Sequence, residues 1–207
     1  YFICDPPNDN ADKNAKLINL LRPGEYLGTR MPLPGVNAVY CYYSSQAGTA
    51  ACLHVEDRGL ASMNINVASE AKIWLYIPPH ERDRLEAAIV KEWPQILGTR
   101  SLRSYVRCAQ FVGHHNMLIL PSFLKECDIE FQIIIQRAGQ LLYTEPGAYH
   151  QVINTGCNVA TAINYQATLT DEPDGYVWCV KGKCGTKDSV PLSASSGATS
   201  HQTSREF

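Results

Sequence analysis

The sequence predicts a mainly β protein, a double-stranded β-helix or jelly roll of the cupin type with one helical insertion. Short segments of strand composition, with apolar residues that alternate in several of them, follow one another, with turn-forming residues about every 8 to 12 residues. A single segment changes to a helical period, between Pro79, where a helix can begin, and Pro94, where the pattern ends. At 207 residues, 45% of them hydrophobic, the chain is long enough for one domain with a substantial core.

The expected strands follow in chain order. Their composition is β-branched, aromatic or alternating, and turn residues separate them. In the helical insertion Leu85, Ile89 and Val90 share one face. A brief helix is expected at 122–127, opened by Pro121 and Ser122. Another is expected near 15–21, and 101–111 is expected to be helical or irregular. The predicted strands are 37–44, 49–55, 62–68, 71–78, 117–120, 131–137, 140–146, 149–154 and 157–167.

Composition excludes several functional classes. The net charge of −2 and the pI of about 6.3 do not indicate a globally basic protein, so sequence-specific nucleic-acid binding is not expected. Apolar runs such as 117–120 are too short to span a bilayer, and no membrane contact is expected. There is no signal-peptide pattern, and a chain that starts at Tyr1 resembles an excised fragment. With this much core, eight cysteines are not needed as disulfide staples.

A candidate metal site begins in the strand that ends near residue 55. On a strand, residues two apart point to the same face, so His54 and Glu56 present an imidazole and a carboxylate side by side. Two histidines and one carboxylate form the facial triad that holds iron(II) with positions open for ligands. The alternative is a polar pair on a solvated strand. Among the other histidines, His150 lies on a predicted strand, whereas His80 and His201 are poorly placed.

Four motifs in this order resemble one known family. HVED at 54–57, Asn64, AKIWLYIPP at 71–79 and EPGAYHQVINTGCNVATAINYQ at 145–166 are similar to the jumonji C (JmjC) oxygenases. These enzymes use iron(II) and 2-oxoglutarate. The resemblance extends over about 35–184 and is closest to the zinc-containing JmjN/JmjC demethylases of trimethylated histone lysine. It implies the cupin-like jelly roll together with a C-terminal zinc-binding segment.

The resemblance assigns an iron and co-substrate site. His54, Glu56 and His150 match the iron ligands. Lys72 matches the lysine that pairs with the far carboxylate of 2-oxoglutarate, although a lysine alone is more typical of a solvent-exposed position. Asn64 matches the asparagine that hydrogen-bonds the same co-substrate. Tyr1 lies near the position of a further contact. The resemblance also places Asn164 and Asn154 facing the site.

The same resemblance implies a pocket for methylated lysine. The carbonyl of Gly35, the hydroxyl of Tyr42 and a carboxylate oxygen of Glu56 are expected to surround the methylammonium group. Oxygen atoms suit this task because methyl hydrogens beside a cationic nitrogen make weak CH···O contacts. Ala162 and Ile163 are expected to form the floor. The alternative for Tyr42 is an aromatic residue of the barrel wall.

Zinc is implied by cysteines and a histidine that lie outside the iron motifs. Cys108 and His114 match two zinc ligands, and Cys179 with Cys184 supplies the others, a set that suits tetrahedral zinc. The family has one residue between the last two cysteines, whereas this chain has four. His115 stands where a lysine is often found beside the oxygen path. The remaining cysteines are expected in the core, namely Cys41, Cys52, Cys127 and Cys157.

The expected organisation is four consecutive parts. Residues 1–34 lead into the catalytic domain, 35–170 form the JmjC jelly roll, and 171–185 form the zinc-binding segment. Residues 186–207 are rich in Ser and Thr and are expected to be a flexible tail. The JmjN segment of the family is not part of this chain.

The implied function is a nuclear histone lysine demethylase. It would oxidise N-methyl groups of a methylated histone tail in chromatin and release formaldehyde, succinate and CO2. The alternatives are a JmjC protein hydroxylase and a catalytically inactive JmjC module that binds chromatin. A cupin of unrelated function would share the barrel, but it would not need Lys72, Asn64 and the zinc cysteines together. The sequence does not specify which histone lysine or methylation state is used.

Overall fold

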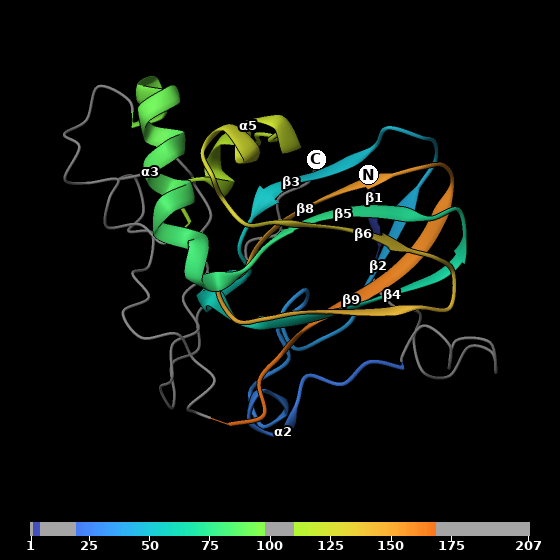
Figure 1. The fold of residues 1–207 in the computed structure, drawn as a ribbon. Coiled ribbons are helices and arrows are strands. Elements are labelled where there is room, and N and C mark those ends of the chain that lie inside the picture. Colours follow the sequence, from blue (N-terminus) through green and yellow to red (C-terminus); the bar gives the residue numbers. More distant parts are fainter. Residues whose placement is uncertain (1, 5–19, 98–109, 169–207) are drawn as a thin grey trace, which may run out of the picture.

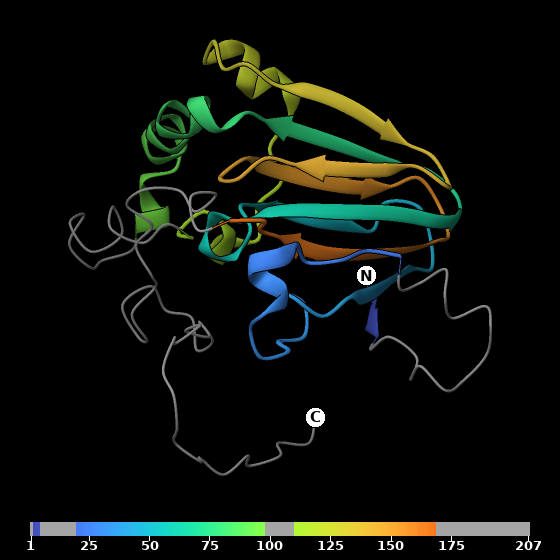
Figure 2. The same cartoon turned by 90° about the horizontal axis from the view of Figure 1, so that it is seen from below.

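Two antiparallel β-sheets face each other and make up the body of the molecule (Figure 1). The structure is a computed structural model that describes residues 2–4, 20–97 and 110–168. In Figure 1 the second of these sheets lies above the first, and Figure 2, from below, shows their strands side by side with one sheet in front of the other. This arrangement confirms the predicted mainly β jelly roll. The proposed zinc-binding segment and the tail lie outside the described residues.

The first sheet has five strands in the order β1–β2–β9–β4–β7. Strand β9 pairs with β2 on one side and with β4 on the other, all antiparallel. Because strand neighbours come from distant parts of the sequence, the N-terminal and C-terminal segments of the barrel lie side by side. The strands are β1 (Phe2–Cys4), β2 (Tyr40–Ser44), β4 (Ala61–Ser69), β7 (Leu141–Thr144) and β9 (Asn158–Tyr165).

The second sheet has four strands in the order β3–β8–β5–β6. It consists of β3 (Ala50–His54), β8 (Tyr149–Asn154), β5 (Lys72–Ile77) and β6 (Gln132–Gln136). Strand β8 therefore lies between the strand that carries His54 and the strand that carries Lys72. This order brings three separate sequence motifs onto one sheet.

The segment 117–120 is not a strand, contrary to the sequence prediction. Its backbone is held by a side chain: the Gln151 amide donates to the Ile119 carbonyl and accepts from the Ile119 N–H, both at 2.8 Å. The Leu53 N–H also donates to the Met117 carbonyl at 2.8 Å. Apolar composition predicted burial correctly, since Ile119 is buried, but it could not distinguish a side-chain anchor from a backbone ladder.

The predicted helical insertion is confirmed. A 3-10 turn, η2 (Pro79–Glu81), leads into α3 (Arg82–Glu92), and η3 (Pro94–Leu97) follows. Leu85 and Ile89 are fully buried, whereas Val90 is only partly buried. The remaining helices are short: α2 (Glu25–Gly28), η1 (Asp57–Gly59), η4 (Gly113–His115) and α5 (Pro121–Glu126).

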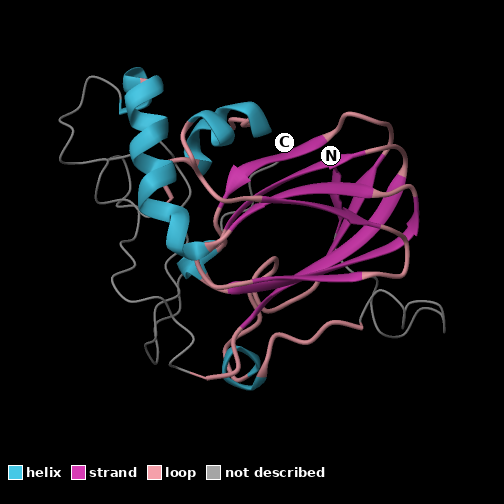
Figure 3. Ribbon diagram, in the orientation of Figure 1, coloured by secondary structure: helices cyan, strands magenta, loops and turns pink. Residues whose placement is uncertain are grey.

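The main apolar core lies between these helices and the second sheet. Leu85 and Ile89 of α3 and Leu124 of α5 pack with Leu75 and Ile77 of β5. Figures 1 and 3 show α3 and α5 together at one end of the sheets. The helices therefore cover the end of the outer face that carries Leu75 and Ile77, while Ile133, Ile135 and Ile153 of the same sheet remain exposed. The space between the sheets is left to other side chains.

Polar side chains fill much of the space between the sheets. Along β4, Ser62, Asn64 and Asn66 are buried, while Met63 and Ile65 pack on the outer side of the sheet. Ser62 meets Thr144 of β7 through their hydroxyls at 2.6 Å. Each buried polar group needs a hydrogen-bond partner, whereas apolar side chains need none. The interior is therefore built to hold something polar.

The free cysteines are distributed differently from the prediction. Cys41 is buried, and Cys52 and Cys127 are half-buried. The expectation that Cys157 is a core residue is wrong, because it is exposed. It follows the turn between β8 and β9, where the chain passes over the surface. No helix among the described residues is long and apolar enough to cross a membrane.

We predict that Leu85→Ala lowers the free energy of unfolding by about 2 to 5 kcal/mol, because it leaves a cavity between α3 and β5. Urea unfolding followed by circular dichroism measures this loss. Lys91→Ala, at an exposed position on the same helix, is the control and should stay within about 0.5 kcal/mol. Equal effects for both variants would contradict the assignment of this face as core.

Candidate metal centre

The pairing of β3 with β8 brings two histidines together. His54 and His150 are direct cross-strand partners, and their ring centroids lie 4.4 Å apart. The register shifts between Ala51 and His54, which marks a bulge in β3. A bulge changes the direction in which following side chains point. Here Leu53 packs in the apolar core while His54 faces its partner.

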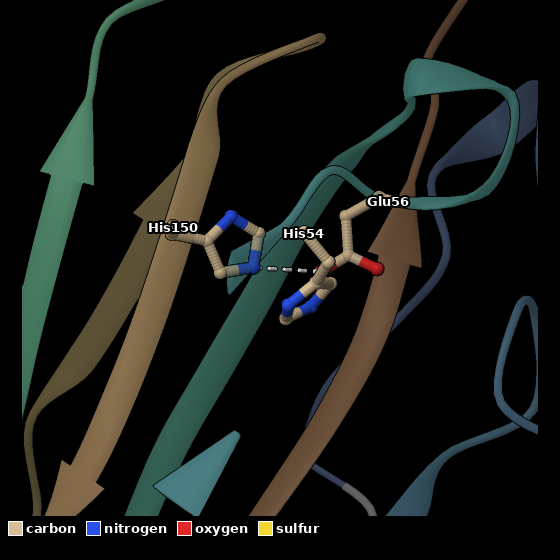
Figure 4. A group of neighbouring side chains, drawn as sticks. All are labelled: His54, Glu56 and His150. Atoms are coloured by element: carbon tan, nitrogen blue, oxygen red, sulfur yellow. Dashed lines mark ion pairs between the residues drawn. The ribbon is translucent and has the colours of Figure 1, made fainter. Parts of the chain in front are cut away.

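Glu56 completes a group of three possible metal ligands (Figure 4). Strand β3 ends at His54, but the backbone of Glu56 remains extended, so the predicted same-face relation holds. Glu56 Oε1 lies 3.4 Å from His150 Nε2. One ligand atom from each of the three residues falls within 4.8 Å of the others. The sequence predicted this triad, and the structure brings its members together.

Neighbouring groups hold the Glu56 carboxylate in place. The Asn164 side chain donates from Nδ2 to Glu56 Oε2 at 3.0 Å. The Gln110 side chain donates to the Glu56 carbonyl at 3.0 Å, and the Gly59 N–H donates to the same carbonyl at 2.8 Å. The turn η1 that follows requires a left-handed residue, Arg58, at φ 57°. Asn164 therefore holds the Glu56 carboxylate, and Gln110 and Gly59 hold its backbone carbonyl.

Backbone carbonyls orient the two imidazole rings. His54 Nδ1 lies 2.6 Å from the carbonyl oxygen of Cys52, and His150 Nδ1 lies 3.2 Å from that of Ala148. A ring that donates from Nδ1 to a carbonyl keeps a lone pair on Nε2. Both Nε2 atoms are then available as metal ligands. This is the usual arrangement around a ligating histidine.

The electrostatics favour the protonation states that a metal requires. Burial lowers the pKa of His54, and the neighbouring His150 lowers it further. Burial alone would raise the pKa of Glu56, but the hydrogen bond from His150 and the charges of both histidines lower it to about 2. At neutral pH His54 is therefore neutral and Glu56 is ionised. The site can accept a divalent cation without first releasing protons from these two groups.

A second group of possible ligands lies on the surface and was missed by the sequence analysis. His80 Nε2 lies 3.3 Å from Glu130 Oε2 and 3.9 Å from Glu81 Oε1. However, the Arg84 guanidinium contacts Glu81 at 3.2 Å and already neutralises it. His80 is also largely exposed. This group is an ion-pair cluster, and it serves below as an internal control.

Lys72 lies deeper between the sheets, on the strand next to β8. It is fully buried, so the exposed-lysine alternative is excluded. Its Nζ donates to Asn154 Oδ1 at 2.8 Å, and Asn158 donates to the same oxygen at 2.9 Å. Burial lowers the pKa of Lys72 to about 8. The ammonium is still mostly protonated at neutral pH and offers a buried positive charge to an anion.

Asn64 is a further buried polar residue, and its Oδ1 has no hydrogen-bond partner in the described part of the chain. A buried amide oxygen without a partner costs free energy unless a ligand supplies one. A buried ammonium and an amide oxygen without a partner suit a polar, carboxylate-bearing ligand, and the Glu56 triad suits a metal. The residues present thus suit iron(II) with 2-oxoglutarate.

The residues predicted for the methyl-lysine pocket lie on β2 and β9 or just before them, apart from Glu56. Tyr42 of β2 lies opposite Ala160 of β9, and Tyr40 lies opposite Ala162. Gly35 has φ +82°, and a Cβ there would fall 2.0 Å from the Tyr40 ring, so the chain can follow this path only with glycine. The two predicted floor residues, Ala162 and Ile163, lie on opposite faces of β9. Ala162 shares the face of Asn164, which contacts Glu56, and Ile163 lies on the other face.

Ile163 is packed away from the space between the sheets. It clusters with Leu21 and Val39 on the outer side of the first sheet and is 2% exposed. Neighbouring residues of a strand face opposite sides, so Ala162 and Ile163 cannot both line one pocket directly. Only Ala162 shares the face of Asn164.

Several predicted residues lie outside the described part of the chain. These are Tyr1 and three of the four predicted zinc ligands: Cys108, Cys179 and Cys184. The fourth, His114, lies in η4, and burial lowers its pKa. A Cβ added at Gly113 of η4 would lie 3.4 Å from the Cβ of His54, which places this turn beside the metal centre. The zinc site remains a prediction.

Sequence reasoning did not identify Trp74 or Gln136 as parts of the site. Trp74 lies with its ring centroid 5.7 Å from that of His150, and its Nε1 donates to Gln136 Oε1 at 2.9 Å. Trp74 could have been predicted from alternation along β5, because it lies two residues from Lys72 and must share its face. The residue at position 136 gave no comparable signal in the sequence.

Comparison with known proteins identifies the family. The profile described as "JmjC domain, hydroxylase" matches residues 41–165, which contain all three members of the triad. The chain belongs to the JmjC family. The resemblance inferred from the sequence motifs is thereby confirmed.

Individual relatives carry demethylase names. The chain is 35% identical over 166 residues to Lysine-specific demethylase 4B of Mus musculus, covering 78% of the chain and 14% of the relative. It is also 35% identical over 133 residues to Lysine-specific demethylase 4D of Rattus norvegicus and to Probable lysine-specific demethylase 4F of Homo sapiens. These matches cover 64% of the chain and 24% and 19% of the relatives. This JmjC chain thus spans a small part of each relative.

We predict that His150→Ala weakens Co(II) binding by more than about 100-fold, because it removes one of three ligands. Isothermal titration calorimetry with Co(II), a substitute for iron that is stable in air, measures the affinity. His80→Ala removes a histidine from the surface ion-pair cluster and should leave the affinity unchanged. Loss of Co(II) binding in His80→Ala, with binding retained in His150→Ala, would show that the metal binds at the surface ion-pair cluster and not at the triad.

Proposed function

We propose that this chain is the catalytic domain of a histone lysine demethylase that depends on iron(II) and 2-oxoglutarate. The observation that carries the proposal is the triad of His54, Glu56 and His150, preassembled beside a buried lysine. The demethylase names of its relatives support the same reading. A methylated histone tail in chromatin would be the substrate, and the nucleus would be the location.

The triad would hold iron(II) through the Nε2 atoms of both histidines and the Glu56 carboxylate, and the metal would replace the contact between His150 Nε2 and Glu56 Oε1. Iron(II) with 2-oxoglutarate and oxygen supplies the oxidation of an N-methyl carbon, which gives formaldehyde, succinate and CO2. The carbonyls of Cys52 and Ala148 hold the rings in the ligating tautomer. Asn164 holds the carboxylate by a hydrogen bond that also lowers its pKa.

Lys72 would pair with the far carboxylate of 2-oxoglutarate, and Asn64 would hydrogen-bond the co-substrate. Asn154 holds the Lys72 ammonium in the interior. Because water is excluded there, the attraction between the ammonium and a carboxylate is stronger than at a surface. The protein thereby orients the co-substrate and keeps its reactive end at the triad.

The methylated lysine would enter on the side of Glu56, between Gly35 and Tyr42. The Asn164 N–H donates to the Val36 carbonyl at 2.9 Å, which ties the Gly35 turn to β9, and the Asn164 side chain bonds the Glu56 carboxylate. Carbonyl, hydroxyl and carboxylate oxygens in this region suit a methylammonium group. We also propose that Cys108, His114, Cys179 and Cys184 bind a structural zinc ion. Tyr1 is retained as a further co-substrate contact.

Two other functions of the family use the same triad. A JmjC protein hydroxylase would leave the oxygen on a side chain, and an inactive module would bind a methylated tail without reaction. The family profile that matches is described as a hydroxylase, which keeps the first alternative in view. Demethylation releases formaldehyde, whereas hydroxylation does not, so their products distinguish the two reactions.

We expect the purified chain, loaded with iron(II) and 2-oxoglutarate under argon and then exposed to oxygen, to demethylate trimethylated histone peptides. Mass spectrometry should show losses of about 14 mass units with matching formaldehyde, since each methyl carbon leaves as an aldehyde. His150→Ala should abolish the reaction, and His80→Ala should not. A gain of about 16 units without formaldehyde would establish hydroxylation instead. No change with any peptide would favour the binding module.

We expect the affinity of the Mn(II)-loaded chain for 2-oxoglutarate to fall as pH rises through about 8, because Lys72 then loses its proton. Lys72→Met should abolish this pH dependence and weaken binding strongly at neutral pH. The same variant should raise the free energy of unfolding at pH 7 by about 1 to 3 kcal/mol, since a buried ammonium is removed. Unchanged co-substrate affinity in Lys72→Met would contradict its role.

A further inference from the structure

The turn that connects β7 to β8 lies against the metal centre. It runs over residues 145–148 and crosses from the first sheet to the second. The Ala148 N–H donates to the Glu145 carbonyl at 3.1 Å, which closes the turn. Gly147 has φ +76°, a conformation that favours glycine. The turn enters β8 two residues before His150.

Backbone hydrogen bonds link this turn to two members of the triad. The Ala148 carbonyl accepts the bond from His150 Nδ1 at 3.2 Å. The Gly147 N–H donates to the Gly59 carbonyl at 2.9 Å, and the Gly59 N–H donates to the Glu56 carbonyl at 2.8 Å. A displacement of the turn would therefore rotate the His150 ring and move the loop that carries Glu56.

A side-chain pair outside the triad fixes the turn to the second sheet. The Tyr76 hydroxyl donates to Glu145 Oε2. Tyr76 lies on β5 as the direct cross-strand partner of His150, so its ring is next to the imidazole on the same face. It is 8% exposed, whereas Glu145 is exposed. The bond thus spans from β5 of one sheet to the end of β7 in the other.

The hydroxyl remains a donor over the whole useful pH range. Burial raises the pKa of Tyr76, and the Glu145 carboxylate raises it further. A hydrogen bond to a charged acceptor is stronger than one between neutral groups, so this bond can hold the turn in one position. Neither residue belongs to the triad or to the predicted co-substrate contacts.

We propose that Tyr76 and Glu145 are positioning residues that hold the 145–148 turn, and through it the His150 ring and the Glu56 loop, in the geometry that binds a metal. This inference rests on the proposed metal-binding role of the triad. The pair acts through the turn, since the phenol is engaged by Glu145 and the Ala148 carbonyl is the group that contacts His150.

The test is Co(II) affinity together with the visible absorption of the bound Co(II), which reports ligand geometry without any catalytic turnover. Tyr76→Phe keeps the ring and removes the hydroxyl, and Glu145→Ala removes the acceptor. Each should weaken Co(II) binding by about 10- to 100-fold, the effect typical of groups that orient a metal ligand, and should change the absorption. Glu145→Gln keeps an acceptor oxygen and should restore most of the affinity.

Tyr149→Phe is the matched control. Tyr149 is adjacent to His150 on β8 and also donates its hydroxyl to a carboxylate, Glu86 Oε1, at 2.8 Å. It faces the apolar core under α3 instead of the space between the sheets. The variant therefore loses the same kind of bond beside the same ligand and should leave Co(II) affinity and absorption unchanged.

The double variant Tyr76→Phe with Glu145→Ala should bind Co(II) no more weakly than either single variant, because one shared bond is already lost in each. Wild-type affinity and absorption in Tyr76→Phe and Glu145→Ala would overturn the inference while leaving the triad in place. If Glu145→Gln binds Co(II) as weakly as Glu145→Ala, the effect comes from the charge of Glu145 and not from its hydrogen bond. That result would also overturn the inference. Failure of the wild-type chain to bind Co(II) would instead overturn the proposed metal centre.

Discussion

The antiparallel pairing of β3 with β8 is the constraint on which the candidate site depends. It sets His54 opposite His150, and the bulge in β3 directs Leu53 to the core while His54 faces its partner. Strand β8 in turn aligns His150 with Tyr76 and Asn154 with Lys72 on β5. One register therefore fixes the metal ligands, the pair that supports them and the buried ammonium. A shift of one residue would turn all these side chains to the other face.

Buried polar side chains between the two sheets lower the stability of the fold and provide groups that can bind a ligand. Lys72, Asn64 and Asn158 are buried, and the last two keep side-chain oxygens without a partner among the described residues. Apolar residues of similar volume would pack there at lower cost. The fold tolerates this because its apolar core lies elsewhere, between the second sheet and α3 with α5. Separation of the apolar core from the polar interior allows one small domain to carry both.

The sequence was sufficient for the fold class and for the ligands that follow a simple period. Alternation placed His54 with Glu56, and the order of motifs singled out His150 and Lys72. Long-range pairing was not readable in the same way. The contact of Tyr76 with Glu145, the Gln151 anchor of Ile119 and the burial of Lys72 depend on which strands become neighbours, and residue types alone do not determine that. The outward packing of Ile163 was predictable from alternation, because its neighbour Asn164 faces inward.

The separation of β3 and β8 along the chain has a consequence for folding. Four strands, the helical insertion and α5 lie between them, so their pairing closes one of the longest loops in the domain. Contacts of this range form late and slow the folding of β-rich domains. The two histidines therefore cannot act as a nucleus for an ion in the newly made chain. An ion that binds only after the strands have closed acts on the finished barrel, where it slows reopening instead of guiding assembly.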